Sequence, residues 1–151
     1  MDKNTAVEAD EVPDEVAILL GRIVFYGGRV DTLLGRLVPP KGEQPGSRGL
    51  SGKQLTGALA DHASNDPALA AVLAGYEEQY EWRNRIIHGA LSLGAAALWI
   101  WHIPIGGRGA AAQSFQLRIT DLERLAESWR NLADAAHALL HRNQPDGPAD
   151  G

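Results

Sequence analysis

The feature that most constrains the fold of this chain is a long apolar stripe that begins just after Pro13. Apolar or small residues recur there at alternating steps of four and three, namely Val16, Leu20, Ile23, Gly27, Val30, Leu34 and Leu37. That spacing places all of them on one face of an α-helix. Asp14 and Glu15 suit the positive end of such a helix, and Pro39-Pro40 predicts its end. The sequence therefore predicts a long amphipathic helix that packs against other elements.

Three arginines run beside this stripe at seven-residue intervals, each directly after a glycine: Gly21-Arg22, Gly28-Arg29 and Gly35-Arg36. A glycine inside a helix costs about 1 kcal/mol relative to alanine, so three at this interval suggest the close approach of another backbone. One interpretation is a solvated face on which the glycines are a coincidence. The other is a basic ridge that meets a second subunit or an RNA backbone, with Arg22 and Arg29 as RNA contacts.

A connection rich in glycine, proline and polar residues reaches to Gly49, and a short helix follows it. Ser51 can cap this helix, which is expected to run to about Ala63. Leu55 and Leu59 lie one turn apart in it, so they predict the side that faces the core.

A third helix is predicted from Asp66 to His88, because Asp66 can cap it and Pro67 suits its first position. Gly89 is expected to end it in the left-handed conformation. One stripe of this helix consists of Leu69, Leu73, Tyr76, Tyr80, Arg83 and Ile87. An unpaired charge on such an apolar face is expensive, so the position of Arg83 requires an explanation.

The residues around Arg83 form the pattern Arg83-Asn84-x-x-x-His88-Gly89. This pattern resembles the Arg-Asn-x-x-x-His signature of the HEPN superfamily. The resemblance implies an all-helical domain that usually dimerises, with the two motifs facing each other across the two-fold axis. For active members it also implies metal-independent cleavage of RNA. Some toxin members carry a tyrosine two residues after the histidine, which a partner nucleotidyltransferase modifies; Ala90 stands at that position here, which argues against such modification.

The side chains of the motif suit RNA cleavage by attack of a 2′-hydroxyl group. That reaction needs proton transfer at the attacking and leaving oxygens, and a cation beside the phosphate. His88 can transfer protons near neutral pH, Arg83 can bind the scissile phosphate, and Asn84 can orient either of them. Arg83 and His88 are about 140° apart on an ideal helix, so two copies across a two-fold axis are expected to form the site. Arg85 is a further candidate for a phosphate contact.

The same motif also has a structural interpretation. Arg83 can pair with an acidic residue, such as Glu77 or Glu81 of its own helix, while His88 only caps the helix end. The domain is then a non-catalytic RNA-binding or protein-assembly module. The third hypothesis is a plain helical protein in which the motif arose by chance.

After the motif, the periodicity changes to that of β-strands. Residues 97–103 and 113–119 each alternate between two sets of side chains, as strands with two different faces do. The segment Gly106-Gly107-Arg108-Gly109 lies between them and predicts the turn of a β-hairpin rather than a phosphate-binding loop. Trp99 and Trp101 belong to the core, to a dimer patch or, as the third alternative, to a surface for base stacking.

Thr120 and Glu123 have the spacing of a capping box, which predicts the start of the last long helix. This helix is expected to end near Arg142. Its apolar face consists of Leu122, Leu125, Trp129, Leu132, Ala136 and Leu139. His137 and His141 have the spacing of a metal-binding pair, but no acidic third ligand stands nearby in the sequence, so no metal site and no cofactor are predicted.

Composition sets further limits. The chain has 151 residues, which suits one domain, and it contains no cysteine, which excludes disulfides, thiol nucleophiles and cysteine metal sites. Its net charge of -5 argues against binding of nucleic acid by bulk electrostatics, so an RNA contact must be a local basic patch. No segment has the length of a membrane span and no signal region is present, so a cytoplasmic location is expected. Residues 1–12 predict a flexible acidic tail and residues 143–151 a disordered one.

Together these patterns predict a mainly α fold over residues 13–142: a HEPN-like bundle of about four helices, with a β-hairpin inserted before the last long helix. The first functional hypothesis is a metal-independent endoribonuclease that leaves 2′,3′-cyclic phosphate ends and acts as a homodimer. A toxin–antitoxin or phage-defence system is the expected setting. The expected partners are a second copy, an RNA substrate and, in such a system, an antitoxin or regulatory protein.

Overall fold

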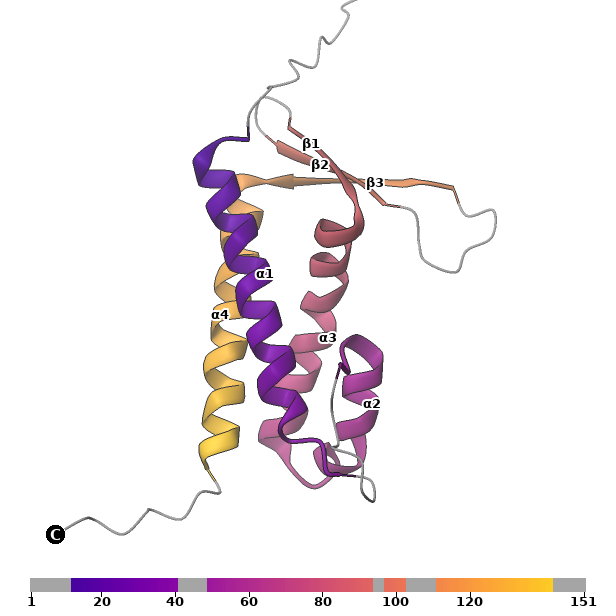
Figure 1. Cartoon of the computed structure of the whole chain (residues 1–151), viewed down its shortest axis with the longest axis vertical. Coiled ribbons are helices and arrows are strands. Elements are labelled where there is room, and N and C mark those ends of the chain that lie inside the picture. The colour runs from indigo at the N-terminus through magenta and orange to yellow at the C-terminus, as the bar shows by residue number, and fades with distance from the viewer. Residues whose placement is uncertain (1–11, 41–48, 94–96, 103–110, 143–151) are drawn as a thin grey trace, which may run out of the picture.

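The computed structural model describes residues 12–40, 49–93, 97–102 and 111–142. This part of the chain contains four helices and three strands (Figure 1): α1 Asp14–Gly35, α2 Gly52–Ala63, α3 Pro67–His88, β1 Ala90–Leu93, β2 Ala97–His102, β3 Gln113–Arg118 and α4 Ile119–His141. The prediction of a mainly helical fold with strands before the last helix is confirmed. The predicted tails, apart from Val12, and the glycine-rich segment at residues 106–109 fall outside the described residues.

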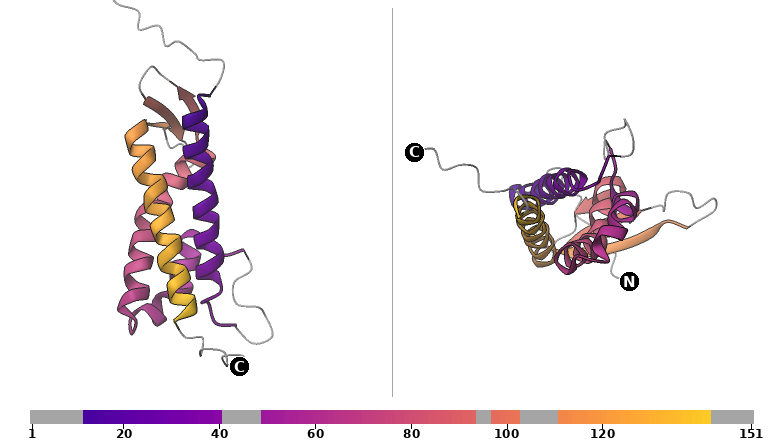
Figure 2. Two further views of the ribbon diagram at one scale, coloured as in Figure 1. Left: turned by 90° about the vertical axis from the view of Figure 1, so that its left-hand side faces the viewer. Right: turned by 90° about the horizontal axis from the view of Figure 1, so that it is seen from below.

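The three long helices run side by side, and the small sheet lies across one end of them (Figure 1). α1 and α4 run in the same direction and make the most extensive contact between helices, whereas α3 runs the opposite way. The short α2 packs on α3 at the end away from the sheet. Seen from below, the four helices surround one common core (Figure 2).

The predicted apolar stripes meet in this core. In α1 the buried side chains include Ile23 and Val30, which are 0% exposed, as the spacing of four and three predicted. In α4 the large ring of Trp129 is also fully buried. It contacts Tyr76 of α3 edge to face, with 5.8 Å between the ring centroids. Aromatic contact of this kind joins α3 to α4 in the middle of the bundle.

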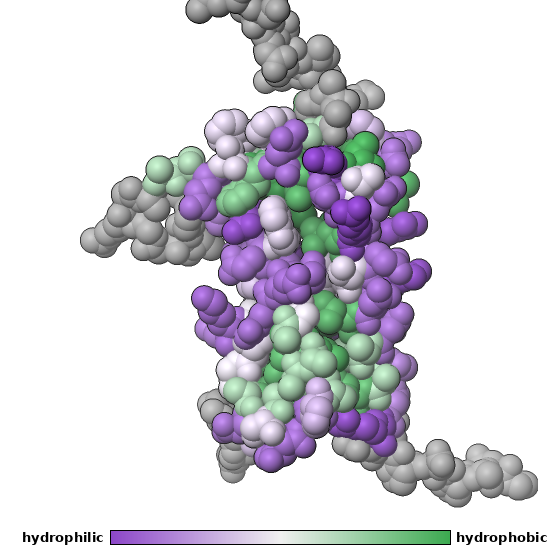
Figure 3. Space-filling model, turned by 180° about the vertical axis from the view of Figure 1, so that it is seen from behind, coloured by the Kyte–Doolittle hydropathy of each residue, from purple (hydrophilic) through white to green (hydrophobic). Residues whose placement is uncertain are grey.

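α3 and α4 approach each other closely on the back of the molecule. Gly75 permits this approach, because a Cβ there would lie 2.9 Å from Cδ2 of Leu132. Small apolar residues gather over the lower part of this face, where the surface is coloured pale green (Figure 3). None of the helices that the structure describes is long and apolar enough to cross a membrane.

The sheet has three antiparallel strands in the order β1-β2-β3, one more than predicted. β2 and β3 form the predicted hairpin pair, and β1 lies on the other side of β2 with Ala90 opposite Trp101. Leu98 and Ile100 are buried in the core, whereas Trp99 and Trp101 are 37% and 52% exposed on the outer side. The pattern did not reveal β1 because this strand has four residues, three of them exposed.

The expectation that Gly89 ends α3 in the left-handed conformation is wrong. Its φ of -86° and ψ of 154° are extended and lead directly into β1. Glycine is needed there for space instead. A Cβ would lie 2.6 Å from Cγ2 of Ile100 and would also collide with the carbonyl oxygen of Arg85.

The predicted capping box of Thr120 and Glu123 is also wrong. β3 runs into α4 without a loop, so the helix begins at Ile119 and Thr120 already lies inside it. The capping carboxylate is that of Asp121, whose Oδ2 accepts a hydrogen bond from the backbone N–H of Arg118 at 2.9 Å. Ser51 does precede α2 as predicted, but its side chain makes no capping hydrogen bond.

The start of α3 follows the prediction and has a second function. Oδ1 of Asp66 accepts a hydrogen bond from the backbone N–H of Leu69 at 3.2 Å. The same carboxylate binds both terminal nitrogens of Arg142 at the end of α4. The hydrogen bond from Arg142 lowers the pKa of Asp66, and the carboxylate in turn raises the pKa of Arg142. This ion pair joins the first turn of α3 to the last turn of α4.

Candidate functional site around Arg83

Arg83 faces the interior of the bundle, as its place in the apolar stripe of α3 implied. Its Nη1 donates a hydrogen bond to Oδ2 of Asp31 in α1 across 2.7 Å, and the two side chains are only 13% and 18% exposed. The expected acidic partner therefore exists, but it comes from another helix and not from Glu77 or Glu81. Breaking so sheltered a pair is costly, because the remaining partner becomes a nearly buried, uncompensated charge.

Tyr76 extends this ion pair into a network that reaches three helices. Its hydroxyl donates to Oδ1 of Asp31 at 2.5 Å and accepts a hydrogen bond from the backbone N–H of Gly52 at 2.8 Å. Asp31 thus binds α3 at two points, and Tyr76 connects both to the first residue of α2. Burial, followed by the hydrogen bond with Asp31, raises the pKa of Tyr76, so the hydroxyl stays protonated and remains a donor.

Two glycines provide the space that the network occupies. A Cβ at Gly27 would lie 2.5 Å from both Cδ and Nε of Arg83, so the arginine crosses α1 where α1 has no side chain. A Cβ at Gly52 would lie 2.6 Å from the ring of Tyr80, and the φ of Gly52 is +56°, a region that favours glycine. Both glycines therefore serve the interior of this chain.

Trp129 borders the network on the side of α4. The guanidinium carbon of Arg83 lies 5.7 Å from the centroid of the Trp129 ring, within the range of a cation–π contact. Nε of Arg83 and Nε1 of Trp129 are buried and have no hydrogen-bond partner in the part of the chain that the structure describes. The guanidinium therefore has donors left after it has bound Asp31.

His88 and Asn84 are placed differently from Arg83. His88 is the last residue of α3 and is exposed, and Asn84 is half-buried one turn before it. Within the described residues neither side chain makes a hydrogen bond or an ion pair. Because Arg83 is directed at α1, one copy of the chain does not join the arginine and the histidine into one site.

The last turn of α3 also departs from the predicted stripe. Ile86 is 5% exposed and occupies the core position, whereas Ile87 is 43% exposed. The helix turns Ile86 inward because this turn packs against β2. Val24 of α1 is exposed to a similar extent, at 45%. Val24 lies about one turn from Gly27 in α1, and Ile87 lies about one turn from Arg83 in α3, both toward the end of the bundle that carries the sheet. Their exposed side chains therefore form apolar surface near the motif.

Arg85 lies among aromatic rings. Its guanidinium carbon is 4.0 Å from the centroid of Phe115 and 4.8 Å from that of Trp82, and these rings meet edge to face at 5.8 Å. Contacts on two rings restrict the side chain without neutralising its charge. Three positions separate Arg85 from His88 on α3, so the two remain neighbours on the helix surface.

Arg22 and Arg29, the predicted RNA contacts in α1, are both exposed. Arg29 stands two positions after Gly27, about 200° around the helix, so it lies on the side of α1 that faces away from Arg83. Arg22 borders a groove between α1 and α4 that also contains three glutamates. The structure therefore does not bring these arginines together with the motif.

The two histidines in α4 lie side by side, one turn apart. The rings of His137 and His141 lie 4.2 Å apart. Among the residues described, no three histidine, aspartate or glutamate side chains gather in a way that holds a metal ion.

The prediction from sequence missed Asp31 and Tyr76 as members of the site. The sequence does carry a signal for Asp31, an acidic residue next to the buried Val30 in a helix whose later charges are otherwise arginines. Asp31 beside the apolar stripe of α1 and Arg83 within the apolar stripe of α3 are the two partners of this sheltered ion pair. Which helices pack together is not contained in either pattern.

No family model, no curated protein and no solved structure matches this chain.

Proposed function

We propose that this chain is a HEPN-like domain and acts as a metal-independent endoribonuclease. His88 would transfer protons, Arg83 would bind the scissile phosphate, and Asn84 would support both. The observation that carries the proposal is the position of His88, which is exposed and uncommitted at the end of α3. The Arg83–Asp31 pair fixes that helix five residues earlier. A cytoplasmic toxin–antitoxin or phage-defence system, with an antitoxin as regulatory partner, is the setting that belongs to this proposal.

The proposed reaction needs two copies of the chain. One His88 would take the proton of the 2′-hydroxyl as its oxygen attacks phosphorus, and the other would protonate the 5′-oxygen as its bond to phosphorus breaks. The product would carry a 2′,3′-cyclic phosphate and a free 5′-hydroxyl. The exposed Val24 and Ile87 beside the motif offer apolar surface on which two motif ends can meet.

A second candidate function is a non-catalytic assembly or RNA-binding module of the same fold. The Arg83–Asp31 ion pair favours it, because a guanidinium that already binds a carboxylate has less charge to offer a phosphate. In this case Arg83, Asp31 and Tyr76 stabilise the bundle, and His88 remains a surface residue.

RNA cleavage in the presence of EDTA distinguishes the two functions. The purified chain is incubated with several classes of RNA, and the ends of the products are identified. We expect cleavage with 2′,3′-cyclic phosphate ends, and we expect His88→Ala to reduce the rate by about 10²–10⁴-fold, as the loss of a proton-transfer group does. Arg83→Lys retains a positive charge beside Asp31 but loses the planar guanidinium group that can bind a phosphate at two points. The cleavage rate should therefore fall while the protein stays folded.

His62→Ala is the matched control, because His62 is another exposed histidine near the end of a helix. It should leave cleavage unchanged. A folded wild-type protein that cleaves none of the RNA classes would contradict the endoribonuclease proposal and favour the non-catalytic module. Cleavage that persists in both the His88 and the Arg83 variants would locate the activity elsewhere and reject the motif.

A further inference from the structure

The outer side of α1 carries the most exposed large apolar side chains of the described residues. Ile18 is 54% exposed and Phe25 is 63% exposed. With Gly21, Gly28 and Thr32 they form one row on the helix, at steps of three and four. We call these five residues the outer α1 face. Large apolar side chains that gather on one exposed helix row mark a surface for association.

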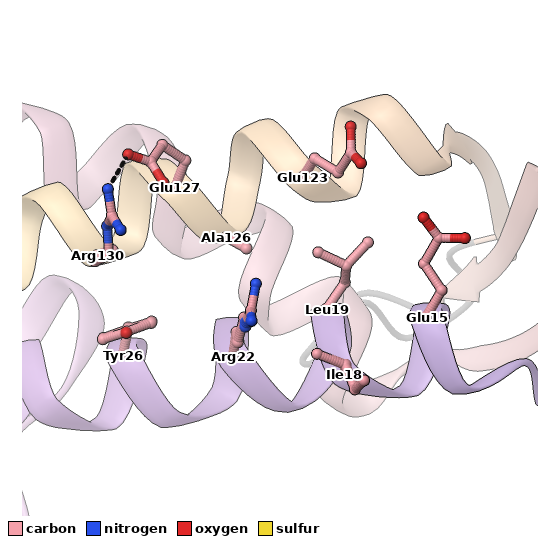
Figure 4. Close-up of a pocket in the computed structure, with 9 residues that line it drawn as sticks. All are labelled: Glu15, Ile18, Leu19, Arg22, Tyr26, Glu123, Ala126, Glu127 and Arg130. Carbon is pink, nitrogen blue, oxygen red and sulfur yellow. Dashed lines mark hydrogen bonds and ion pairs between the residues drawn. The ribbon is translucent and has the colours of Figure 1, made fainter.

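Two separate grooves between α1 and α4 follow one flank of the outer α1 face, and together we call them the furrow. Its upper part has a volume of about 730 Å³, and Arg22 and Tyr26 are among the residues that line it (Figure 4). Its lower part has a volume of about 440 Å³ and is bordered by Phe25 and Arg36 of α1 and by residues of α4. A side chain that projects from another molecule therefore finds space beside α1.

The two glycines of the outer α1 face make room for no other described residue of the chain. Nothing lies within 4 Å of a Cβ built on Gly21 or on Gly28, whereas a Cβ on Gly27 would collide with Arg83. A helical glycine costs about 1 kcal/mol relative to alanine, and no contact among the described residues explains why alanine is absent at either position. Close approach of a second backbone does explain it.

The charges along the furrow are segregated. Glu15 and Glu123 lie at the end of the upper part near the sheet (Figure 4), whereas Glu127 in the same part forms an ion pair with Arg130. Arg29 and Arg36 lie in the lower part. One end of the flank is therefore acidic and the other basic, with Arg22 between them. A surface with this arrangement is complementary to itself when it is turned by a two-fold axis.

We propose that a second copy of this chain docks on the outer α1 face, antiparallel, about a two-fold axis near Phe25. With the axis between Phe25 and Tyr26, Glu15 of each copy lies beside Arg36 of the other, and the two phenylalanines meet at the centre. The steps of three and four favour a shallow crossing angle of about 20°, which keeps the ends of the two helices in contact.

This inference goes beyond the proposed function. The outer α1 face and the side of α1 that contacts Arg83 are opposite sides of the helix, so docking there does not use the motif. Phe25→Asp should therefore weaken association through this face without reducing cleavage, whereas His88→Ala should reduce cleavage without weakening this association.

The first test is the mass of the assembly, measured by light scattering and sedimentation over a range of concentrations. Phe25→Asp should halve the mass at micromolar concentration and raise the dissociation constant at least about 100-fold, because a central aromatic contact is lost from both copies. The fold should persist, since Phe25 is exposed in the single chain. Circular dichroism and thermal unfolding check that it does.

The second test exchanges charges. Glu15 and Arg36 are about 30 Å apart along one α1 helix, so they cannot contact each other within one chain. Glu15→Arg and Arg36→Glu should each weaken association, while the double variant should restore it. An equimolar mixture of the two single variants should also associate, because each chain then offers the charge that the other needs.

Three results would each overturn the proposal: a wild-type protein that is monomeric at all concentrations, a Phe25→Asp variant with the mass of the wild type, or a double charge variant that stays as weak as the single ones. Gly28→Ala gives a further check, because it should stabilise the single chain and weaken association. A gain in both quantities would contradict close approach at that position.

Discussion

Gly27 and Gly28 are adjacent in the sequence, but only one of them lies against another helix. The first lies under the side chain of Arg83 and has no room for a methyl group, whereas the second faces open space. In the sequence Gly27 belongs to the apolar stripe and Gly28 to the repeated Gly-Arg pattern, but neither pattern shows that an arginine of another helix lies over Gly27. Their difference arises only when α3 places an arginine across α1.

Gly27→Ala should therefore destabilise the protein, although alanine is the better helix former. The added methyl group displaces the Arg83 side chain from Asp31, and we expect a loss of about 1–3 kcal/mol in the free energy of unfolding, as overpacking produces. Gly57→Ala is the matched control, because Gly57 lies inside α2 with nothing near a built Cβ. It should stabilise the protein by up to about 1 kcal/mol. Urea unfolding measures both; equal effects of the two substitutions would contradict the collision.

Among the elements, the helices could be predicted with good accuracy and the strands in part. Periodicity is a local property, so α1 and α3 emerged directly from their apolar steps, and Asp66 marked a helix start that the structure confirms. β1 could not be predicted, because a strand of four mostly exposed residues carries no period and exists through its pairing with β2. Of the candidate site, the motif was visible in the sequence, but its partner Asp31 was not, since that contact requires knowing that α1 packs on α3.

The ion pair between Asp66, at the start of α3, and Arg142, at the end of α4, makes the stability of the protein depend on pH in the acid range. The pKa of Asp66 is lowered in the folded state by the hydrogen bond from Arg142. Its contribution to stability is therefore present above the unfolded pKa and is lost as the pH falls through the lower, folded value. We expect Asp66→Asn to keep the cap of α3, because asparagine caps helices as well as aspartate does, and to reduce the acid dependence of stability.

Urea unfolding at pH 7 and at pH 3 measures this effect, with Asp66→Ala as the comparison. The alanine variant loses both the cap and the ion pair, so it should be less stable than the asparagine variant at both pH values. An asparagine variant that keeps the full acid dependence of the wild type would assign that dependence to other carboxylates.

For the whole molecule, the Tyr76 hydroxyl of α3 is important because its hydrogen bonds connect three helices: it donates to Asp31 of α1 and accepts from the N–H of Gly52 in α2. The pKa of Tyr76 is raised above the ordinary value of about 10. Its contribution to stability is therefore fully present below about pH 10 and is lost as the pH rises further, because the unfolded chain ionises first. The wild type should lose stability in alkali more steeply than a variant that lacks this hydroxyl.

Tyr76→Phe provides that variant. At neutral pH it should lower the free energy of unfolding by about 1.5–3 kcal/mol, because the charged carboxylate of Asp31 no longer accepts a hydrogen bond from residue 76 and the Gly52 N–H loses its partner. Between pH 8 and pH 11 its stability should change less than that of the wild type. Tyr26→Phe, at a half-buried tyrosine, is the control and should follow the wild type.

The packing of α1 on α4 also determines when, during synthesis, the apolar face of α1 can be buried. α1 is made first, yet the helix that covers most of its apolar face begins only at Ile119. Until α4 has left the ribosome, the buried stripe of α1 remains open to water and to other nascent chains. Contacts between residues so distant in sequence also slow folding relative to bundles whose neighbouring helices pack in order. For this chain, the period of greatest exposure to aggregation and to chaperones is therefore the interval between the synthesis of α1 and the synthesis of α4.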